Sequence, residues 1–438
     1  MLGASLGLAL LVLHADPAPT EVVEEEVPPH RADPIRFEVG AKLDVRSGQP
    51  EGIPGTSLTD VEIDPYVALR LPFRAGAFTI AYEPRLFIVI REYPPASGAQ
   101  TVSYLNRGRL VLDFSPEPRW RLYVEGRFAY GENDFLPLST VITPTTGTGA
   151  PPTQPGTTPT APTPAPGQST LPDTRFLRIV GIDASAGFVY AISPRLGWRF
   201  AGGYTYSGGA DASVRSTLPL QKGPHGQTGL DWAASRADTL TFLLDASNLH
   251  FSNGPQSTIV SLTTTWTHAW DRNFGTDLLA GIGGMHALVP PTTVGATPGK
   301  TVTNAAYPVG GVGVHYFWPT RAFTWDNGLT FLAAPAPDRL SGLVNERLSA
   351  AVRSSLAPLR QLVFDVTAVA SRAIDVDQRD LRIETKATYL LGSQFGISLG
   401  ARMAWLSGST LLGPQGFGWL AFVSVGTSAG TNLFGDSK

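Results

Sequence analysis

Charged side chains alternate with apolar ones in the segment IRFEVGAKLDVR (35–46), near the start of the chain. In a β-strand successive side chains point to opposite faces, so one face of this segment would carry both signs of charge and the other would be apolar. Fixed charges beside water can bind, orient or select polar and charged solutes. The chemistry that this pattern indicates is solute binding along a charged surface, and the apolar face must then contact either a protein core or lipid.

Residue types that carry catalysis or bind metals are scarce. The chain has no cysteine and seven histidines, which excludes disulfides and cysteine-based nucleophiles or metal sites. Five histidines lie at or near the ends of predicted strands without metal-ligand spacing: His225, His250, His268, His286 and His315. We therefore expect no catalytic residue, metal or cofactor, and no enzyme. The alternative is a Ser/His or Asp/His cluster formed across neighbouring strands at a rim. The formal charge of -3 gives no indication of nucleic-acid binding.

The alternating pattern recurs to the end of the chain in about eighteen segments, such as 78–91, 239–251 and 395–406. The segments run roughly 10–15 residues, longer than the 5–6 usual in soluble sheets and sufficient for a tilted transmembrane strand. Even the most helix-like segment, 341–356, contains such a stretch. Since a closed barrel is the only sheet that leaves no unpaired edge in lipid, we predict an all-β fold, a transmembrane antiparallel up-and-down β-barrel of about 18 strands.

Every second connection between the predicted strands is short, as at 74–76, 193–195 and 271–273, and most of the others are longer. This asymmetry is typical of outer-membrane barrels, which have short periplasmic turns and longer extracellular loops. Aromatic residues flank the short turns, as expected of a girdle at the membrane interface. The pattern predicts that the apolar face of 35–46 contacts lipid and that the charged face lines a lumen.

The rest of the chain divides by composition. Residues 1–15 resemble a secretory signal peptide that is removed on export, although they lack a basic start. Residues 16–34 are acidic and Pro-rich and predict a periplasmic tail. Residues 35–438 form the predicted barrel, and a Pro/Thr-rich extracellular loop at 131–175 is expected to be disordered.

Strand parity predicts which charged residues line the lumen. Basic residues predominate in the first five and the last five strands, which closure of the barrel would bring together as one wall. The predicted basic wall consists of Arg36, Lys42, Arg46, Arg70, Arg85, Arg91, Arg107, Arg109, Arg119, Arg121, Arg127, Arg347, Arg353, Arg382, Lys386 and Arg402. The predicted acidic wall opposite consists of Asp183, Asp231, Asp245, Asp277 and Asp326. Opposed walls would set up a transverse field; the alternative is that these charges pair locally.

From its alternation, loop asymmetry and aromatic residues, 35–438 resembles Gram-negative outer-membrane β-barrels. Its size and lack of a plug are similar to the 18-stranded barrel component of exopolysaccharide export systems. The resemblance implies an outer-membrane location, contact with outer-membrane lipid and a conduit that works with a periplasmic polysaccharide-export protein. The chain departs from the common pattern of a terminal aromatic residue, because GDSK follows Phe434.

Two other functions fit the same pattern. One is a general diffusion porin for small hydrophilic solutes, and the other is a non-conducting anchor or adhesin whose working part is 143–172. Polymer export predicts that a mutant lacks surface polymer, whereas a porin predicts reduced solute uptake. An adhesin predicts that removing 143–172 abolishes the phenotype while conductance survives. The sequence leaves the transported substrate and the oligomeric state open.

Overall fold

The structure is a computed structural model that describes residues 35–49, 57–93, 102–134, 176–289, 301–320, 323–337, 344–374, 378–392, 395–407 and 416–432. The predicted signal peptide and acidic tail lie outside these residues. So does most of the predicted loop 131–175, of which the first four residues belong to a strand that continues to Asp134.

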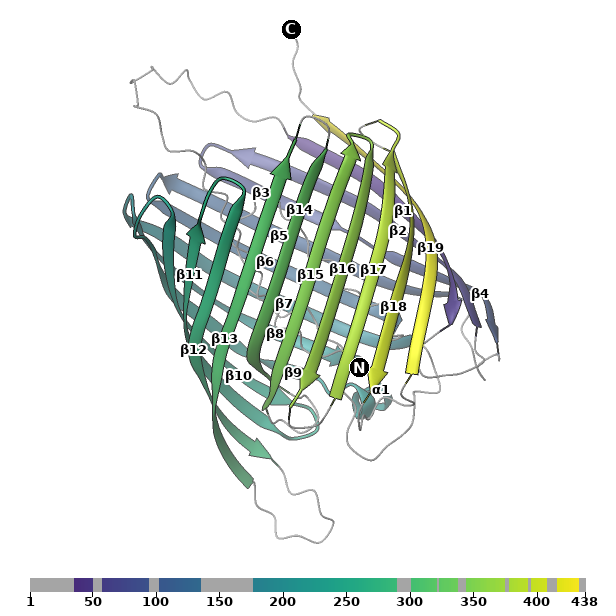
Figure 1. The fold of residues 1–438 in the computed structure, drawn as a ribbon. Helices are drawn as coiled ribbons and strands as arrows, with labels where there is room; N and C mark the ends of the chain where they lie inside the picture. Colours follow the sequence, from purple (N-terminus) through teal and green to yellow (C-terminus); the bar gives the residue numbers. More distant parts are fainter. Residues whose placement is uncertain are drawn as a thin grey trace.

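The described residues form one antiparallel sheet that closes on itself (Figure 1). Its first strand pairs along its whole length with the last strand, from Arg36 opposite Asn432 to Gln49 opposite Trp419. The strands are β1 (Arg36–Gln49), β2 (Ser57–Phe73), β3 (Gly76–Tyr82), β4 (Arg85–Tyr93), β5 (Val102–Glu117), β6 (Trp120–Asp134), β7 (Phe176–Ser193), β8 (Leu196–Gly209), β9 (Gln221–Ala233), β10 (Asp238–Phe251), β11 (Gln256–Ala269), β12 (Phe274–Val289), β13 (Thr301–Pro319), β14 (Thr324–Pro337), β15 (Val344–Leu359), β16 (Leu362–Ala373), β17 (Gln378–Leu390), β18 (Phe395–Ser407) and β19 (Gly416–Asn432).

The segments β3 and β4 are two halves of one strand, which makes the barrel 18-stranded. Both halves pair with β2 on one side and with β5 on the other. The interruption falls at Glu83 and Pro84, where proline has no N–H to donate to a neighbouring strand. The predicted fold class and the prediction of about 18 strands are confirmed, and the helix-like segment 341–356 contributes to strand β15.

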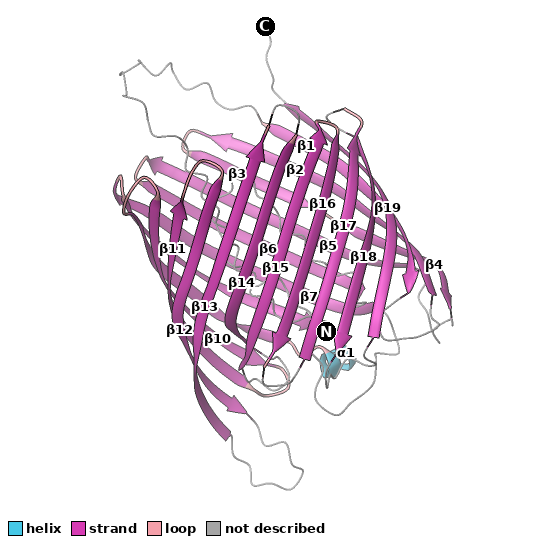
Figure 2. Cartoon of the chain, viewed as in Figure 1, coloured by secondary structure: helices cyan, strands magenta, loops and turns pink. Residues whose placement is uncertain are grey.

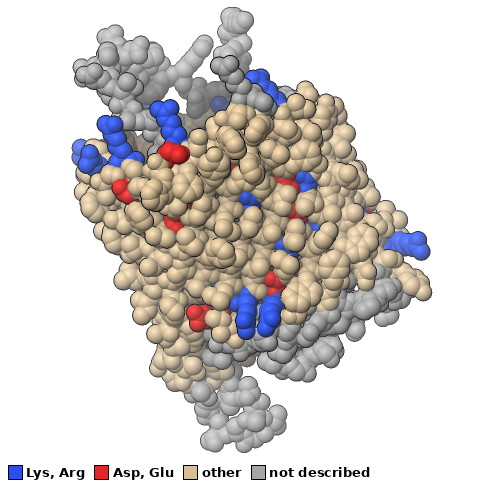
Figure 3. Space-filling model, viewed as in Figure 1, with Lys and Arg blue, Asp and Glu red and all other residues tan. Residues whose placement is uncertain are grey.

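The two faces of each strand differ as the alternation predicts. On β1, Leu43 and Val45 are 40% and 42% exposed, whereas Asp44 and Arg46 are 3% and 2% exposed. Large apolar side chains are likewise exposed on the other strands, for example Leu262 on β11 and Leu399 on β18. The outer surface is therefore largely uncharged, as the tan surface in Figure 3 shows. An apolar outer face around a closed sheet is the surface that a lipid bilayer requires.

Five aromatic or imidazole rings lie over a glycine that is directly opposite on the neighbouring strand. A Cβ atom on any of these glycines would come within 3.0 Å of the ring, so only glycine leaves room for it. We call these the ring–glycine pairs. They are Phe128 over Gly108, Tyr123 over Gly187, His225 over Gly203, His315 over Gly275 and Phe422 over Gly400.

The two ends of the barrel are closed differently. At one end the described connections are tight turns, such as Arg74–Ala75 and Pro194–Arg195. At the other end β8 and β9 are joined by a segment containing α1 (Ala212–Thr217), shown in cyan in Figure 2. Arg215 donates hydrogen bonds from its guanidinium to the carbonyls of Gly209 and Ala210, which holds this short helix against the end of β8. No helix among the described residues is long and apolar enough to cross a membrane.

Aromatic side chains are in mutual contact at the tight-turn end. Trp120 lies 4.5 Å from Tyr190 between ring centroids, across β6 and β7. A longer series of rings, with centroids 4.4 to 6.5 Å apart, crosses β11, β12 and β13. The series is Trp266, His268, Trp270, Phe274, Tyr316, Trp318 and Phe323. Phe317, by contrast, is opposite Asp326 and belongs to the inner face.

Candidate pore-lining site

The inner wall carries a cluster of charged residues near the closing seam of the barrel, which we call the β1–β4 charge cluster: Arg46, Asp60, Glu62, Asp64 and Arg85. Arg46 is directly opposite Asp60, and its Nε lies 2.6 Å from the Asp60 carboxylate. A second nitrogen, Nη1, lies 2.6 Å from Glu62. Arg85 on β4 contacts both Glu62, at 2.8 Å, and Asp64, at 3.1 Å. Two arginines thus share three carboxylates across three strands.

This cluster is buried, which makes its pairing obligatory. Asp60 is 0% exposed and the side chain of Arg46 is 2% exposed. An ion without a partner at such a depth costs several kcal/mol, and bidentate pairing with hydrogen bonds offsets that cost. Phe87 adds to the packing, because the guanidinium carbons of Arg46 and Arg85 lie 5.6 and 5.7 Å from its ring centroid. Such distances allow cation–π attraction.

Inner-wall contacts also occur among the last three strands, on the other side of the closing seam. Phe422 on β19 is directly opposite Arg46 on β1, and Arg402 on β18 lies 4.9 Å from the Phe422 ring centroid. Arg402 also forms an ion pair with Glu384 on β17 at 2.9 Å. Inner-wall side chains therefore link β17, β18 and β19, and backbone pairing joins β19 to β1.

Most of the other predicted basic residues are also paired with a nearby carboxylate of the inner wall, and the pair Arg347–Asp380 reaches across β16 from β15 to β17. These ion pairs are Lys42–Asp44, Arg107–Glu83, Arg109–Glu125, Arg121–Asp113, Arg127–Glu125, Arg347–Asp380, Arg382–Asp380 and Lys386–Asp365. Arg36 and Arg70 are opposite each other at the tight-turn end, and Arg353 is opposite Thr367. Local pairing of this kind weakens the field that a wall of unpaired arginines would produce.

Two residues of the predicted basic wall lie elsewhere. Between β2 and β4 the register shifts, so that Asp60 is opposite Val89 but Thr59 is opposite Arg91. The bulge at Ile90 reverses the alternation, and Arg91 shares a row with the outward-facing Thr59. Arg119 occupies the turn between β5 and β6 and belongs to neither strand. Parity counting fails at both positions because it assumes an unbroken strand.

Sequence reasoning also missed two carboxylates of the inner wall, Asp60 and Asp380. Each lies one residue before the first residue of a predicted strand, and both are buried. The signal was present, since Asp60 continues the parity of Glu62 and Asp64. With these acids counted and Arg91 and Arg119 removed, the positive excess of the basic wall is smaller than the sequence suggests.

The residues of the predicted acidic wall face partners of different kinds. Asp231 lies 3.4 Å from Arg199 and accepts a hydrogen bond from Thr241 at 2.7 Å. Asp183 is opposite Arg127, where the two predicted walls meet. By register, Asp245 is opposite Ser261 and Asp326 is opposite Ser355. That the five aspartates of the predicted acidic wall line the surface contacted by a solute remains a prediction.

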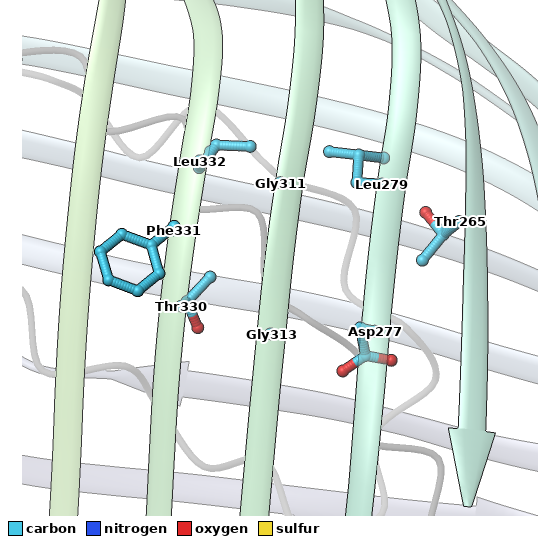
Figure 4. Close-up of a pocket in the computed structure, with 8 residues that line it drawn as sticks. All are labelled: Thr265, Asp277, Leu279, Gly311, Gly313, Thr330, Phe331 and Leu332. Carbon is cyan, nitrogen blue, oxygen red and sulfur yellow. The ribbon is translucent and has the colours of Figure 1, made fainter.

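Asp277 has one carboxylate oxygen without a hydrogen-bond partner among the described residues. Its Oδ1 accepts a hydrogen bond from Thr267 at 2.6 Å, whereas Oδ2 is buried and has no hydrogen-bond partner among the described residues. Figure 4 shows the carboxylate spread across β12, with one oxygen towards β11 and the other towards Gly313 on β13. It borders a shallow pocket lined by Thr265, Asp277, Leu279, Gly311, Gly313, Thr330, Phe331 and Leu332.

Replacing Arg85, Arg109 and Arg121 together by glutamine is expected to shift ion selectivity towards cations. Each arginine is paired with inner-wall carboxylates, which would keep their charge when the arginine is lost. The reversal potential in a KCl gradient across a planar bilayer measures the shift. Glu125→Gln, which removes the acid of the Arg109–Glu125 pair, should shift it the other way. An unchanged reversal potential in both variants would mean that these residues do not line the ion path.

Among the described residues no group of three His, Asp or Glu side chains is placed to hold a metal ion. A search of curated proteins finds no match to this chain.

Several solved outer-membrane proteins are similar to this chain in fold. OpdK of Pseudomonas aeruginosa, solved with vanillate, is 9% identical with a TM-score of 0.43, over 91% of this chain and 99% of that one. OccAB4 of Acinetobacter baumannii is 9% identical with a TM-score of 0.46, over 92% and 100%. OccK11 (OpdR) of P. aeruginosa is 11% identical with a TM-score of 0.44, over 91% and 96%.

The closed 18-stranded sheet with its apolar outer face is a membrane-spanning β-barrel. A comparison with protein families shows which family the chain belongs to. The model of the EpsX exopolysaccharide export family matches residues 35–419, which extend from the residue before β1 into β19. The chain therefore belongs to the EpsX exopolysaccharide export family.

Proposed function

We propose that the barrel is the outer-membrane conduit through which an exopolysaccharide leaves the cell. In this proposal a separate periplasmic export protein delivers the polymer to the tight-turn end. The observation that carries the proposal is the family match across almost the whole barrel. The family is one of transport proteins, which fits the prediction that the chain is not an enzyme.

The chemistry of the inner wall supports a hydrophilic polymer as the transported solute. Sugar hydroxyls both donate and accept hydrogen bonds, and the wall offers groups of both kinds. The side chains of Arg109 and Arg121 are 45% and 34% exposed, and those of Asp113 and Asp231 are 31% and 35% exposed. The paired arginines present charge that is locally balanced. A polymer could therefore exchange hydrogen bonds with the wall without binding tightly to one charge.

Deleting the gene is expected to abolish surface polysaccharide, because the outer membrane is otherwise a barrier to a large hydrophilic polymer. The measurement is cell-surface polysaccharide, quantified in the deletion strain and in a strain complemented with the full chain, which should restore it. Uptake of small hydrophilic solutes is measured in parallel. If surface polysaccharide is unchanged while solute uptake falls, the protein is a diffusion porin and the export proposal is wrong.

A further inference from the structure

An arginine occurs in almost every tight turn of the barrel. In the described turns these residues are Arg74, Arg119, Arg195, Arg236, Arg272 and Arg360, and we call them the arginine collar. All six are exposed. Since the strands run up and down in sequence, the turns that follow β2, β5, β7, β9, β11 and β15 lie at one end of the barrel. Figure 3 shows blue side chains along the upper rim, the end where the tight turns lie in Figure 1.

Exposed aromatic side chains of the outer face lie next to the collar. Phe73 precedes Arg74, Trp120 follows Arg119, and Trp270 is two residues before Arg272. These three aromatic side chains are 43%, 41% and 60% exposed. Tryptophan and other aromatic rings sit at the level of lipid headgroups. The guanidinium groups, one or two residues further towards the turn, are therefore at the level of the headgroup phosphates.

The collar arginines form no ion pairs among the described residues. Three carboxylates lie at this end: Glu117 is exposed and forms no ion pair among the described residues, whereas Asp238 and Asp271 have other partners. Asp238 accepts hydrogen bonds from Trp266 and Ser235 and contacts His268 at 2.7 Å, and Asp271 accepts the backbone N–H groups of Asn273 and Phe274. The collar thus differs from the inner wall, where arginines are paired.

We propose that the arginine collar binds the phosphates of anionic phospholipid headgroups in the leaflet around the tight-turn end. A guanidinium binds a phosphate through two parallel hydrogen bonds, which lysine cannot do. Basic residues near an anionic lipid surface each contribute about 1 kcal/mol of attraction. A collar spread around the circumference would fix the depth of this end in the bilayer. The proposal concerns the outer rim and holds whatever solute the lumen carries.

The test compares lipid selectivity in four proteins refolded into phosphatidylcholine vesicles: the unmodified chain and three variants. The collar variant carries Arg→Gln at all six positions, and a partial variant carries Arg119→Gln, Arg195→Gln and Arg272→Gln. The lumenal control, Arg109→Gln with Arg121→Gln and Arg127→Gln, removes as many charges as the partial variant. Electron spin resonance of spin-labelled phosphatidylglycerol and phosphatidylcholine gives their relative association with the unmodified protein and with each variant.

We expect the unmodified chain and the lumenal control to prefer phosphatidylglycerol about fivefold, the effect of about 1 kcal/mol. The partial variant should show a weaker preference and the collar variant almost none. Equal preference in all proteins would overturn the proposal. So would displacement of phosphatidylglycerol by inorganic phosphate but not by chloride at equal ionic strength, since the collar would then be a free-phosphate site. If the unmodified chain shows no preference for phosphatidylglycerol, the proposal is also wrong, and the collar would be expected to bind an acidic protein partner.

Discussion

Arg46→Met is expected to lower the free energy of unfolding by about 3–5 kcal/mol, the cost of removing one partner from a buried ion pair. The side chain of Arg46 is 2% exposed and holds Asp60, which is 0% exposed, at 2.6 Å. Methionine leaves the Asp60 carboxylate buried without its main counter-ion, and Glu62 loses one of its two arginines. The measurement is urea unfolding of the protein refolded into lipid vesicles.

Arg109→Met is the matched control for this prediction. Arg109 forms one ion pair of similar length, 2.8 Å, with Glu125, but its side chain is 45% exposed. Its loss should cost no more than about 1 kcal/mol, because Arg109 is itself exposed and Arg127 still pairs with Glu125 at 2.6 Å. The double variant Arg46→Met with Asp60→Asn should be less destabilised than Arg46→Met alone. Equal effects of Arg46→Met and Arg109→Met would show that the β1–β4 charge cluster is solvated.

Leu262→Arg is expected to lower the free energy of unfolding by about 2–4 kcal/mol, the cost of a basic side chain on the lipid face near the bilayer midplane. Leu262 is 53% exposed and lies in the middle of β11. An arginine there can reach neither the lumen nor a headgroup without distorting the strand or the bilayer. Urea unfolding in vesicles again supplies the measurement.

The neighbouring variant Thr263→Arg tests whether the face, rather than the arginine itself, produces this cost. Thr263 points to the inner face, because successive residues of a strand alternate. Its substitution should change the free energy of unfolding by less than about 1 kcal/mol, as for other substitutions beside water. A larger cost for Thr263→Arg than for Leu262→Arg would reverse the assignment of inner and outer faces on β11.

Alternation predicts the barrel well because a strand buried in lipid has little freedom in its pattern. Each residue faces either lipid or lumen. The apolar Leu43 and Val45 therefore indicate the lipid face, and the charged Asp44 and Arg46 indicate the lumenal face. The closed sheet follows, since lipid does not tolerate an unpaired strand edge. The approximate number of strands and their approximate ends could therefore be predicted from the sequence alone.

The details of the inner wall were not accessible, because they depend on register and on strand ends. One extra residue at Ile90 moves Arg91 to the outer face, and nothing in the surrounding residue types indicates it. The pairing of Arg46 with Asp60 requires knowing that the two are opposite across β1 and β2. The buried Asp277 Oδ2 without a hydrogen-bond partner is a result of how its neighbours pack. These features arise from contacts between strands, which a pattern within one strand does not contain.

The ring–glycine pairs have a consequence for how the chain reaches its final shape. A strand that slips by two residues keeps lipid and lumen faces correct, so hydrophobicity alone does not detect the error. Such a slip would place Tyr123 over a residue other than Gly187, and a side chain there would push the ring away. The five ring–glycine pairs lie between five different pairs of neighbouring strands, and each favours the correct register of its own strand pair. A wrong register between any of these strand pairs would be disfavoured while that pair forms, before the first and last strands pair.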